Sequence, residues 1–244
     1  GTLADGEPGA ALGLTYRNKN IFKGSETFNI NIRYGLQRQR YKEENGEINI
    51  FPTQEFGVEA SIFFPKFLAP FRLKESRTEF QPRTTLTVGY NMQSRPIYLR
   101  QTAILTFGYN WMKNQYIQHI LSPFTLNSVK INPTPSFESI LEKETNQRIK
   151  DQYTNHLILG IDYTYIFTNQ DIKLEKDFLY IKANLQSSGN LISAFNNTSL
   201  VKTVDNYHEI FDIRYAQFIR LDLDFRYFNY IGRGNQIASR FIDR

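Results

Sequence analysis

Four charged residues alternate with apolar ones near the C-terminal end of the sequence: Arg220, Asp222, Asp224 and Arg226. Two neighbouring carboxylates could act as a general acid and a general base. Residues two apart in a β-strand lie on one face of the sheet. We therefore interpret the four as a charge ladder, a row of charged side chains that pair with other residues on a polar inner surface, or lumen, of the protein. We assign no catalytic residue and no enzymatic activity.

The other residues capable of chemistry do not form a recognisable site. His119, His156 and His208 share no metal-ligand spacing, and the chain has no cysteine for a disulfide or a thiolate ligand. No glycine-rich phosphate loop, nucleophile elbow or zinc-protease motif occurs in the sequence. We predict no metal site and no cofactor.

Charge and hydropathy narrow the functional classes. The net charge is +5, but lysine and arginine are largely interleaved with acidic residues, so we do not predict nucleic-acid binding. Aromatic residues make up 15% of the chain, yet no apolar run approaches the ~18 residues of a transmembrane helix. A transmembrane β-barrel carries its lipid face at alternate positions and remains compatible with this hydropathy.

The residues above must be positioned by β-strands, because a period of two dominates the sequence. In the stretch 15–37 the apolar residues Phe28, Ile30, Ile32, Tyr34 and Leu36 fall at every second position. Similar alternation recurs to the end of the chain. It predicts nine strands, over residues 9–17, 26–37, 53–64, 83–93, 100–112, 156–168, 177–187, 215–230 and 235–244.

Two long connections interrupt the predicted strands. Residues 114–155 form the longer one, with a short helix over 136–150 that begins at Ser136 as its N-cap, and residues 188–214 form the second. The longer connections all follow odd-numbered strands, so they should share one end of the sheet. Outer-membrane barrels keep long loops outside the cell. The chain should therefore enter from the periplasm, with both long loops extracellular.

Strand length favours a membrane barrel over a soluble two-sheet protein. The predicted strands exceed the ~5–6 residues typical of soluble sheets and suit the ~9–11 residues that a tilted strand needs to cross a bilayer. Aromatic residues at strand ends resemble interfacial girdles. Nine strands cannot close as an even-numbered barrel, so we expect residues 1–244 to be one segment of a larger barrel. A soluble β-sandwich that binds a surface ligand is the alternative fold.

Five short motifs, taken together, resemble one family. They are 16–26 (YRNKNIFKGSE), 63–71 (FFPKFLAPF), 95–98 (RPIY), Trp111 followed by 119–131 (HILSPFTLNSVKI), and 221–226 (LDLDFR). In this order they resemble the barrel of BamA/TamA-type outer-membrane assembly factors, the bacterial surface-antigen family, and are closest to its Bacteroidetes-type members.

This resemblance implies a fold and a location. The family's barrel has sixteen strands and follows periplasmic POTRA repeats, so the chain would be about the first nine strands in the outer membrane. The family inserts outer-membrane proteins, so the implied partners are outer-membrane lipids, nascent outer-membrane proteins and accessory lipoproteins. POTRA repeats, the family's RGF motif and its closing strands are not in this sequence.

The resemblance also implies a site at the seam between the first and last strands, the lateral gate, where an incoming strand adds to the exposed edge. The corresponding residues are Leu12, Gly13, Leu14, Thr15 and Tyr16. Gly13 would weaken the ladder locally, or alternatively would make room for packing.

Two other functions fit the same barrel. It could anchor and export an attached enzyme, such as a patatin-like lipase or a metallophosphatase, or it could be a passive porin. Sequence upstream of Gly1 would identify an attached enzyme, and conductance through a lumen clear of inserted loops would identify a porin.

Overall fold

The computed structural model describes residues 9–42, 48–68, 82–171, 176–190, 202–204, 207–210, 213–232 and 234–243. Ten strands form one sheet, in which each strand runs antiparallel to its neighbours. In order across the sheet they are β1 (Gly9–Asn18), β2 (Thr27–Lys42), β3 (Ile48–Phe64), β4 (Arg83–Ser94), β5 (Tyr98–Asn114), β6 (Ile117–Pro133), β7 (His156–Thr168), β8 (Phe178–Ser188), β12 (Phe218–Gly232) and β13 (Asn235–Asp243). The prediction of an all-β, antiparallel fold is confirmed.

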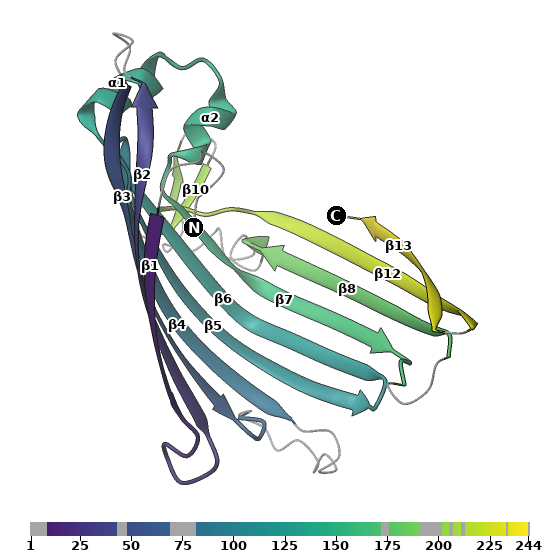
Figure 1. Ribbon diagram of the computed structural model, residues 1–244. Helices are drawn as coiled ribbons and strands as arrows, with labels where there is room; N and C mark the ends of the chain where they lie inside the picture. The colour runs from purple at the N-terminus through teal and green to yellow at the C-terminus, as the bar shows by residue number, and fades with distance from the viewer. Residues whose placement is uncertain are drawn as a thin grey trace.

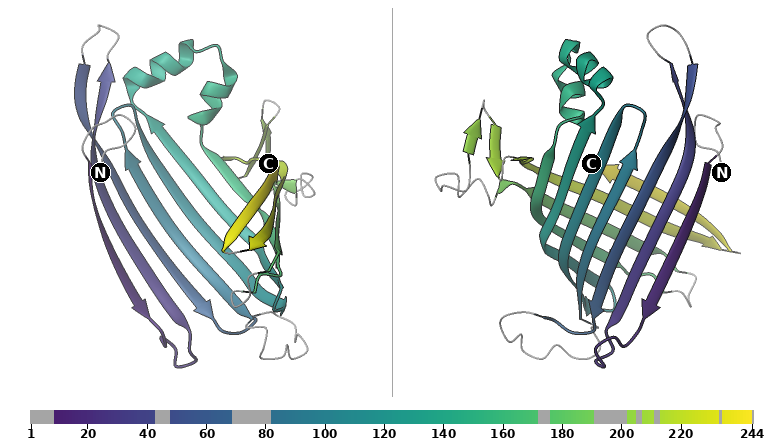
Figure 2. Two further views of the ribbon diagram at one scale, coloured as in Figure 1. Left: turned by 45° about the vertical axis from the view of Figure 1, so that its right-hand side comes forward. Right: turned by 90° about the vertical axis from the view of Figure 1, so that its left-hand side faces the viewer.

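The large sheet is curved but not closed. Figures 1 and 2 show the strands side by side in chain order. In the right-hand view of Figure 2, β12 and β13 lie behind the other strands and slope across them. In the part of the chain that the structure describes, β1 forms one edge and β13 the other. The edges matter because an edge strand leaves a row of main-chain hydrogen-bonding groups open to a further strand.

The sheet contains one strand that the sequence pattern did not predict. Residues 117–133, which we expected within the irregular connection 114–155, form β6 and pair with β5 and β7 along most of their length. The sequence pattern did not predict this strand because β6 contains a bulge between Ser122 and Thr125, at which the pairing register shifts. The apolar face moves from odd residues such as Leu121 to even residues such as Phe124, so the period of two is broken in the middle. Pro123 lies in this bulge, one of the places where a strand tolerates proline.

Because β6 reverses the chain once more, the predicted distribution of loops is wrong. The connection 134–155 and the described residues 189–190 and 215–217 lie at the end of the sheet where β1 begins, and residues 65–68 lie at the opposite end. The chain therefore enters the sheet at the same end as the helix-bearing connection, not opposite it. Figure 1 shows α1, α2 and β10 together at this end.

The helix-bearing connection contains two short helices, α1 (Pro135–Lys143) and α2 (Gln147–Gln152), in place of the single predicted helix over 136–150. The N-cap of α1 is Thr134 rather than Ser136, and the backbone is extended at Glu144 between the helices. The ring of Tyr153 packs edge-on against the rings of Phe137 and Tyr98, which holds this connection to β5.

The second connection, 188–214, is described only in part. It carries a small separate sheet of β9 (Lys202–Val204), β10 (Tyr207–Ile210) and β11 (Ile213–Arg214). The rest of this connection between 191 and 212, like residues 69–71 of the FFPKFLAPF motif and Arg244 of the last predicted strand, lies outside the described residues. Among the helices that the structure describes, none is long and apolar enough to span a membrane.

The strand register gives the sheet one apolar and one polar face. Leu14, Ile32, Val58 and Tyr90 follow one another across β1 to β4 on the apolar face. The residues next to them, Thr15, Asn31, Glu59 and Gly89, pair in the same way across β1 to β4 on the polar face. The same division reaches β12, where Leu221 and Leu223 pair with apolar residues of β8 while Asp222 and Asp224 pair with polar ones.

The apolar face is not covered by another layer of the described chain. Of the described apolar residues, only Val129, Ile131, Leu157, Phe178 and Tyr215 are buried. The chain exposes 17404 Å², whereas a compact monomer of 28.6 kDa would expose roughly 11,000 Å². Among the described residues, the sheet therefore does not bury the core that a soluble globular protein of this size would have.

A close crossing at the end of β8 gives the first testable prediction. Beyond Ser188 the segment 215–216 pairs with the start of β7, and the Ser188 hydroxyl donates to the carbonyl oxygens of Leu159 and Ala216 at 3.3 and 3.1 Å. A Cβ at Gly160 would overlap the Ser187 carbonyl oxygen. We expect Gly160→Ala to force β7 and β8 apart and to lower the free energy of unfolding by about 1–3 kcal/mol.

The measurement is urea-induced unfolding of the full chain in detergent, followed by circular dichroism. Gly13→Ala is the matched control, because a Cβ there meets no atom within 4 Å. Equal stability of the two variants would contradict the assigned packing at Gly160.

Candidate functional site

The edge strand β1 presents the five residues that the sequence analysis singled out, Leu12 to Tyr16. Among the described residues β1 pairs only with β2, in an unbroken antiparallel register from Gly9 to Asn18. The apolar side chains Leu12, Leu14 and Tyr16 are 74%, 66% and 54% exposed. Natural edge strands are usually protected by lysine, proline or a bulge, and none of these occurs between Leu12 and Tyr16. This edge is therefore open to strand pairing.

Gly13 lies in the middle of this edge, on the polar face, directly opposite Arg33 of β2. A Cβ at Gly13 would have open space around it. Within the described residues, close packing therefore does not explain the glycine. Its effect is to leave a gap in the row of side chains along the edge.

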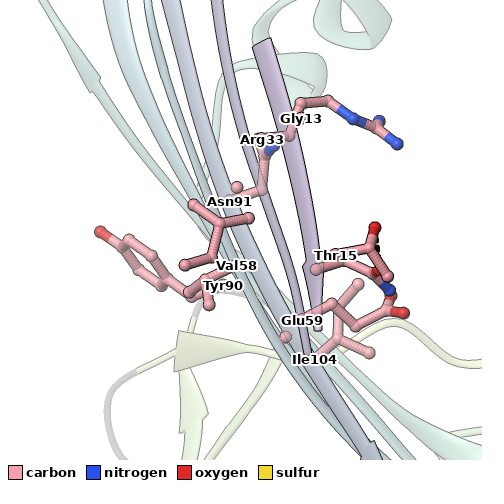
Figure 3. Close-up of a pocket in the computed structure, with 12 residues that line it drawn as sticks. Gly13, Thr15, Arg33, Val58, Glu59, Tyr90, Asn91 and Ile104 are labelled. Carbon is pink, nitrogen blue, oxygen red and sulfur yellow. Dashed lines mark hydrogen bonds between the residues drawn. The ribbon is translucent and has the colours of Figure 1, made fainter. Parts of the chain in front are cut away.

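A hollow of about 260 Å³ lies beside the edge, across β1 to β5. Its lining includes Thr15, Arg33 and Glu59, with glycines such as Gly57 between the longer side chains. In Figure 3 the side chains of Arg33, Thr15 and Glu59 lie to one side of the sheet, and the ring of Tyr90 points to the other. Gly13, Gly57 and Gly89 leave space between the longer side chains of this lining.

The structure brings the predicted charge ladder together on the polar face of β12. The Arg220 Nε lies 3.0 Å from the Asp222 carboxylate, and an Arg226 guanidinium nitrogen lies 2.6 Å from that of Asp224. The sequence analysis missed Arg240 of β13, which also binds Asp224, at 2.8 Å. The ladder residues thus pair with one another and with a neighbouring strand, which leaves no carboxylate pair arranged for acid–base chemistry.

Hydrogen bonds continue across the polar face between these two regions. The Asn184 amide donates to Asp162 at 3.1 Å and to the Thr164 hydroxyl at 2.8 Å. Nearer the β1 edge, the Asn91 amide donates to Glu55 at 2.9 Å. Such cross-strand contacts between polar side chains stabilise the sheet on this face.

Aromatic rings gather on the apolar face at the end of the sheet opposite the helices. Trp111 stacks on His119 with ring centroids 5.0 Å apart, and the His119 Nδ1 lies 2.8 Å from the Tyr163 hydroxyl oxygen. Phe67, from the connection after β3, packs against Tyr109 at 5.6 Å and Trp111 at 5.9 Å. We call the group formed by Phe67, Tyr109, Trp111, His119 and Tyr163 the aromatic band.

The three histidines are not brought together. His119 belongs to the aromatic band on the apolar face, whereas His156 begins β7 and its Nδ1 lies 3.1 Å from the Thr154 carbonyl oxygen. His208 belongs to β10, and its side chain is outside what the structure describes. Among the described residues, no group of three or more histidine or acidic side chains could hold a metal ion.

Asp177, in the connection before β8, is a second residue that the sequence analysis did not single out. Its carboxylate accepts hydrogen bonds from the Tyr230 backbone N–H at 2.8 Å, the Asn229 amide at 2.9 Å and the Tyr227 hydroxyl at 3.1 Å. These bonds, the backbone one foremost, lower the pKa of Asp177 below its ordinary value. The carboxylate fastens the β7–β8 connection to the end of β12.

A pH dependence follows from this lowered pKa. The stabilisation by Asp177 is complete above the unfolded-state pKa of about 4 and is lost as the pH falls through the lower folded-state pKa. We expect Asp177→Asn to lower the urea midpoint at pH 7 and to flatten its decline between pH 5 and pH 3. Glu142→Gln, on the exposed surface of α1, is the control and should preserve the decline of the original protein; an unchanged decline in Asp177→Asn would refute the assignment.

Comparison with protein families, with curated proteins and with solved structures finds no match to the chain. A functional proposal therefore depends on the geometry of the chain itself. The relevant features are the open β1 edge, the two-sided sheet, the charge ladder and the aromatic band.

Proposed function

We propose that this sheet is part of a transmembrane β-barrel of the BamA/TamA type in the bacterial outer membrane. Its apolar face would contact lipid and its polar face would line a water-filled lumen. The exposed apolar face supports this proposal, because soluble proteins rarely expose apolar patches beyond a few hundred Å². By the resemblance in sequence, the whole barrel would have sixteen strands, of which the chain contributes ten rather than the nine first expected.

The width of the apolar face supports the same proposal. Toward the end of the sheet with the helices, this face becomes polar at Gln54 of β3, at Gln101 of β5 and at Lys130, which pairs with Gln101. The opposite boundary is the aromatic band, at the level of Trp111. The strand segments 54–64 and 101–111 between these boundaries match the ~9–11 residues that a tilted strand needs to cross the hydrocarbon. Aromatic girdles border the lipid face of known barrels.

The loops give a direction across the membrane. Longer loops of outer-membrane barrels lie outside the cell, so the end with α1, α2 and the small sheet would be extracellular. Residues 65–68 and the aromatic band would then lie on the periplasmic side, and β1 would begin at the outer end.

We propose that the barrel inserts nascent outer-membrane proteins by templating strand addition at β1, without enzymatic catalysis. The observation that carries this function is the unprotected β1 edge, with exposed apolar side chains along it and a hollow beside it that includes Thr15, Arg33 and Glu59 in its lining. Lipid cannot satisfy the N–H and C=O groups of an edge, so an incoming strand gains hydrogen bonds by pairing there. Outer-membrane lipids, client proteins and accessory lipoproteins are the implied partners.

The test uses the absence of cysteine from residues 1–244, with any cysteine elsewhere in the parent protein replaced by serine. Thr15→Cys places a single thiol on the edge, and Thr102→Cys is the matched control on β5, which has a neighbouring strand on both sides. During assembly of a cysteine-bearing outer-membrane client into membranes holding the full-length parent protein, we expect a disulfide to the client from position 15 and none from position 102. Client crosslinks equal at both positions, or absent from both, would refute strand addition at β1.

A passive porin is the second candidate, favoured by the continuous polar face with its ion pairs at Asp222 and Asp224. It predicts a steady conductance in reconstituted bilayers and no client crosslink at position 15.

A further inference from the structure

We infer that Arg33 makes the β1 edge selective for strands with an acidic side chain on their lumen-facing side, at the position opposite Gly13. This inference rests on the proposed function and specifies its substrate class. It concerns which strands bind at the edge, whereas the proposed function concerns only that strands bind there.

The geometry connects Arg33 to the edge although Arg33 belongs to the second strand. Gly13 is its direct partner on β1, and glycine has no side chain to block the guanidinium. Figure 3 shows the Arg33 side chain extending past Gly13. Arg33 is exposed, and no hydrogen bond or ion pair links it to another of the described residues. A strand paired with β1 would lie two strand spacings from β2, roughly 9.6 Å, a gap that an arginine and a glutamate side chain can close together.

The charge of the two outer strands favours an acidic partner. The sequences of β1 and β2 contain no aspartate or glutamate, whereas they include Arg17 and Arg33 on the polar face. The Arg17 Nε donates to the Asn29 side chain at 2.9 Å, so its charge is not neutralised there. The nearest acids on this face by register are Glu55 and Glu59 of β3, opposite Gly35 and Asn31, and among the described residues no ion pair joins either of them to Arg33. The edge therefore presents a positive potential to an incoming strand.

The test measures selection directly with two synthetic peptides. Each is a twelve-residue strand of alternating apolar and polar residues, with one cysteine to pair with Thr15→Cys and one charged residue two positions C-terminal to that cysteine. In an antiparallel register the charged residue then lies opposite Gly13. The peptides differ only in carrying glutamate or lysine there, and the protein is the full-length parent protein in lipid vesicles.

We expect half-maximal disulfide formation with the glutamate peptide at a concentration roughly threefold to tenfold below that of the lysine peptide. The reason is that opposite charges on neighbouring strands stabilise their pairing, whereas like charges destabilise it. Arg33→Glu in the same cysteine background should invert the preference, and Arg33→Gln should abolish it. Arg100→Glu is the matched control: it makes the same charge change on the polar face of β5, away from the edge, and should leave the preference unchanged.

The outcomes separate the two proposals. If both peptides crosslink equally, or if Arg33→Glu keeps the original preference, charge selection by Arg33 is wrong while strand addition at β1 stands. If neither peptide crosslinks, at any concentration, both the selection and the strand-addition function are wrong. An inverted preference in Arg33→Glu, with the Arg100→Glu control unchanged, supports both.

Discussion

Val88→Arg is expected to lower the free energy of unfolding from a lipid bilayer by about 2–4 kcal/mol, the cost of an arginine on the lipid face near the bilayer midplane. Val88 lies in the centre of β4 on the apolar face, between Ala60 of β3 and Leu105 of β5. Its side chain is 52% exposed, so the proposal places it in contact with hydrocarbon. The measurement is reversible urea unfolding of the full chain in lipid vesicles.

The matched control for Val88→Arg is Asn91→Arg on the same strand. Asn91 lies on the polar face and donates to Glu55, a contact that arginine can replace, so this variant should fold with nearly the original free energy. If both arginines are tolerated equally, the apolar face of β4 does not contact lipid. If Asn91→Arg is the more damaging substitution, the two faces have been assigned the wrong way round.

Asp224→Asn is expected to release β13 from the sheet. Arg226 and Arg240 are direct cross-strand partners, and the Asp224 carboxylate binds both, at 2.6 and 2.8 Å. Without this carboxylate two guanidinium groups face each other, and like charges directly opposite destabilise a strand pair. We expect amide hydrogen exchange in β13 to accelerate roughly tenfold, since hydrogen bonds to charged groups contribute more than neutral ones.

Two further variants test the cause of this effect. Asp222→Asn is the control, because Asp222 binds Arg220 of its own strand and holds no second strand. The double variant Asp224→Asn with Arg240→Gln removes the like-charge contact and should restore most of the protection in β13. Equal acceleration by Asp222→Asn, or no recovery in the double variant, would show that Asp224 does not join the two strands.

The strands could be predicted from the sequence wherever their alternation is unbroken. All nine predicted strands occur, because a sheet with one apolar and one polar face imposes a period of two on each of them. β6 could not be found in this way, since its bulge between Ser122 and Thr125 moves the apolar residues from odd to even positions. The missed strand then reversed every later strand, which is why the predicted placement of the loops was wrong.

The candidate site could be predicted only within single strands. Alternation alone put Arg220, Asp222, Asp224 and Arg226 on one face, as the structure has them. Contacts between strands depend on register, which one sequence does not specify. The pairing of Arg240 with Asp224 and the position of Arg33 opposite Gly13 could therefore not be predicted.

The most direct test of the membrane proposal is a cysteine scan of β8. Each residue from 181 to 186 is replaced in turn in the cysteine-free chain, and isolated outer membranes are treated with a water-soluble maleimide. Lys182, Asn184 and Gln186 belong to the polar face, and Ile181, Ala183 and Leu185 to the apolar face. We predict labelling at 182, 184 and 186 through the lumen and protection at 181, 183 and 185, which a lipid-soluble maleimide should label instead. Uniform labelling at all six positions, or recovery of the protein in the soluble fraction, would contradict a lipid-facing sheet.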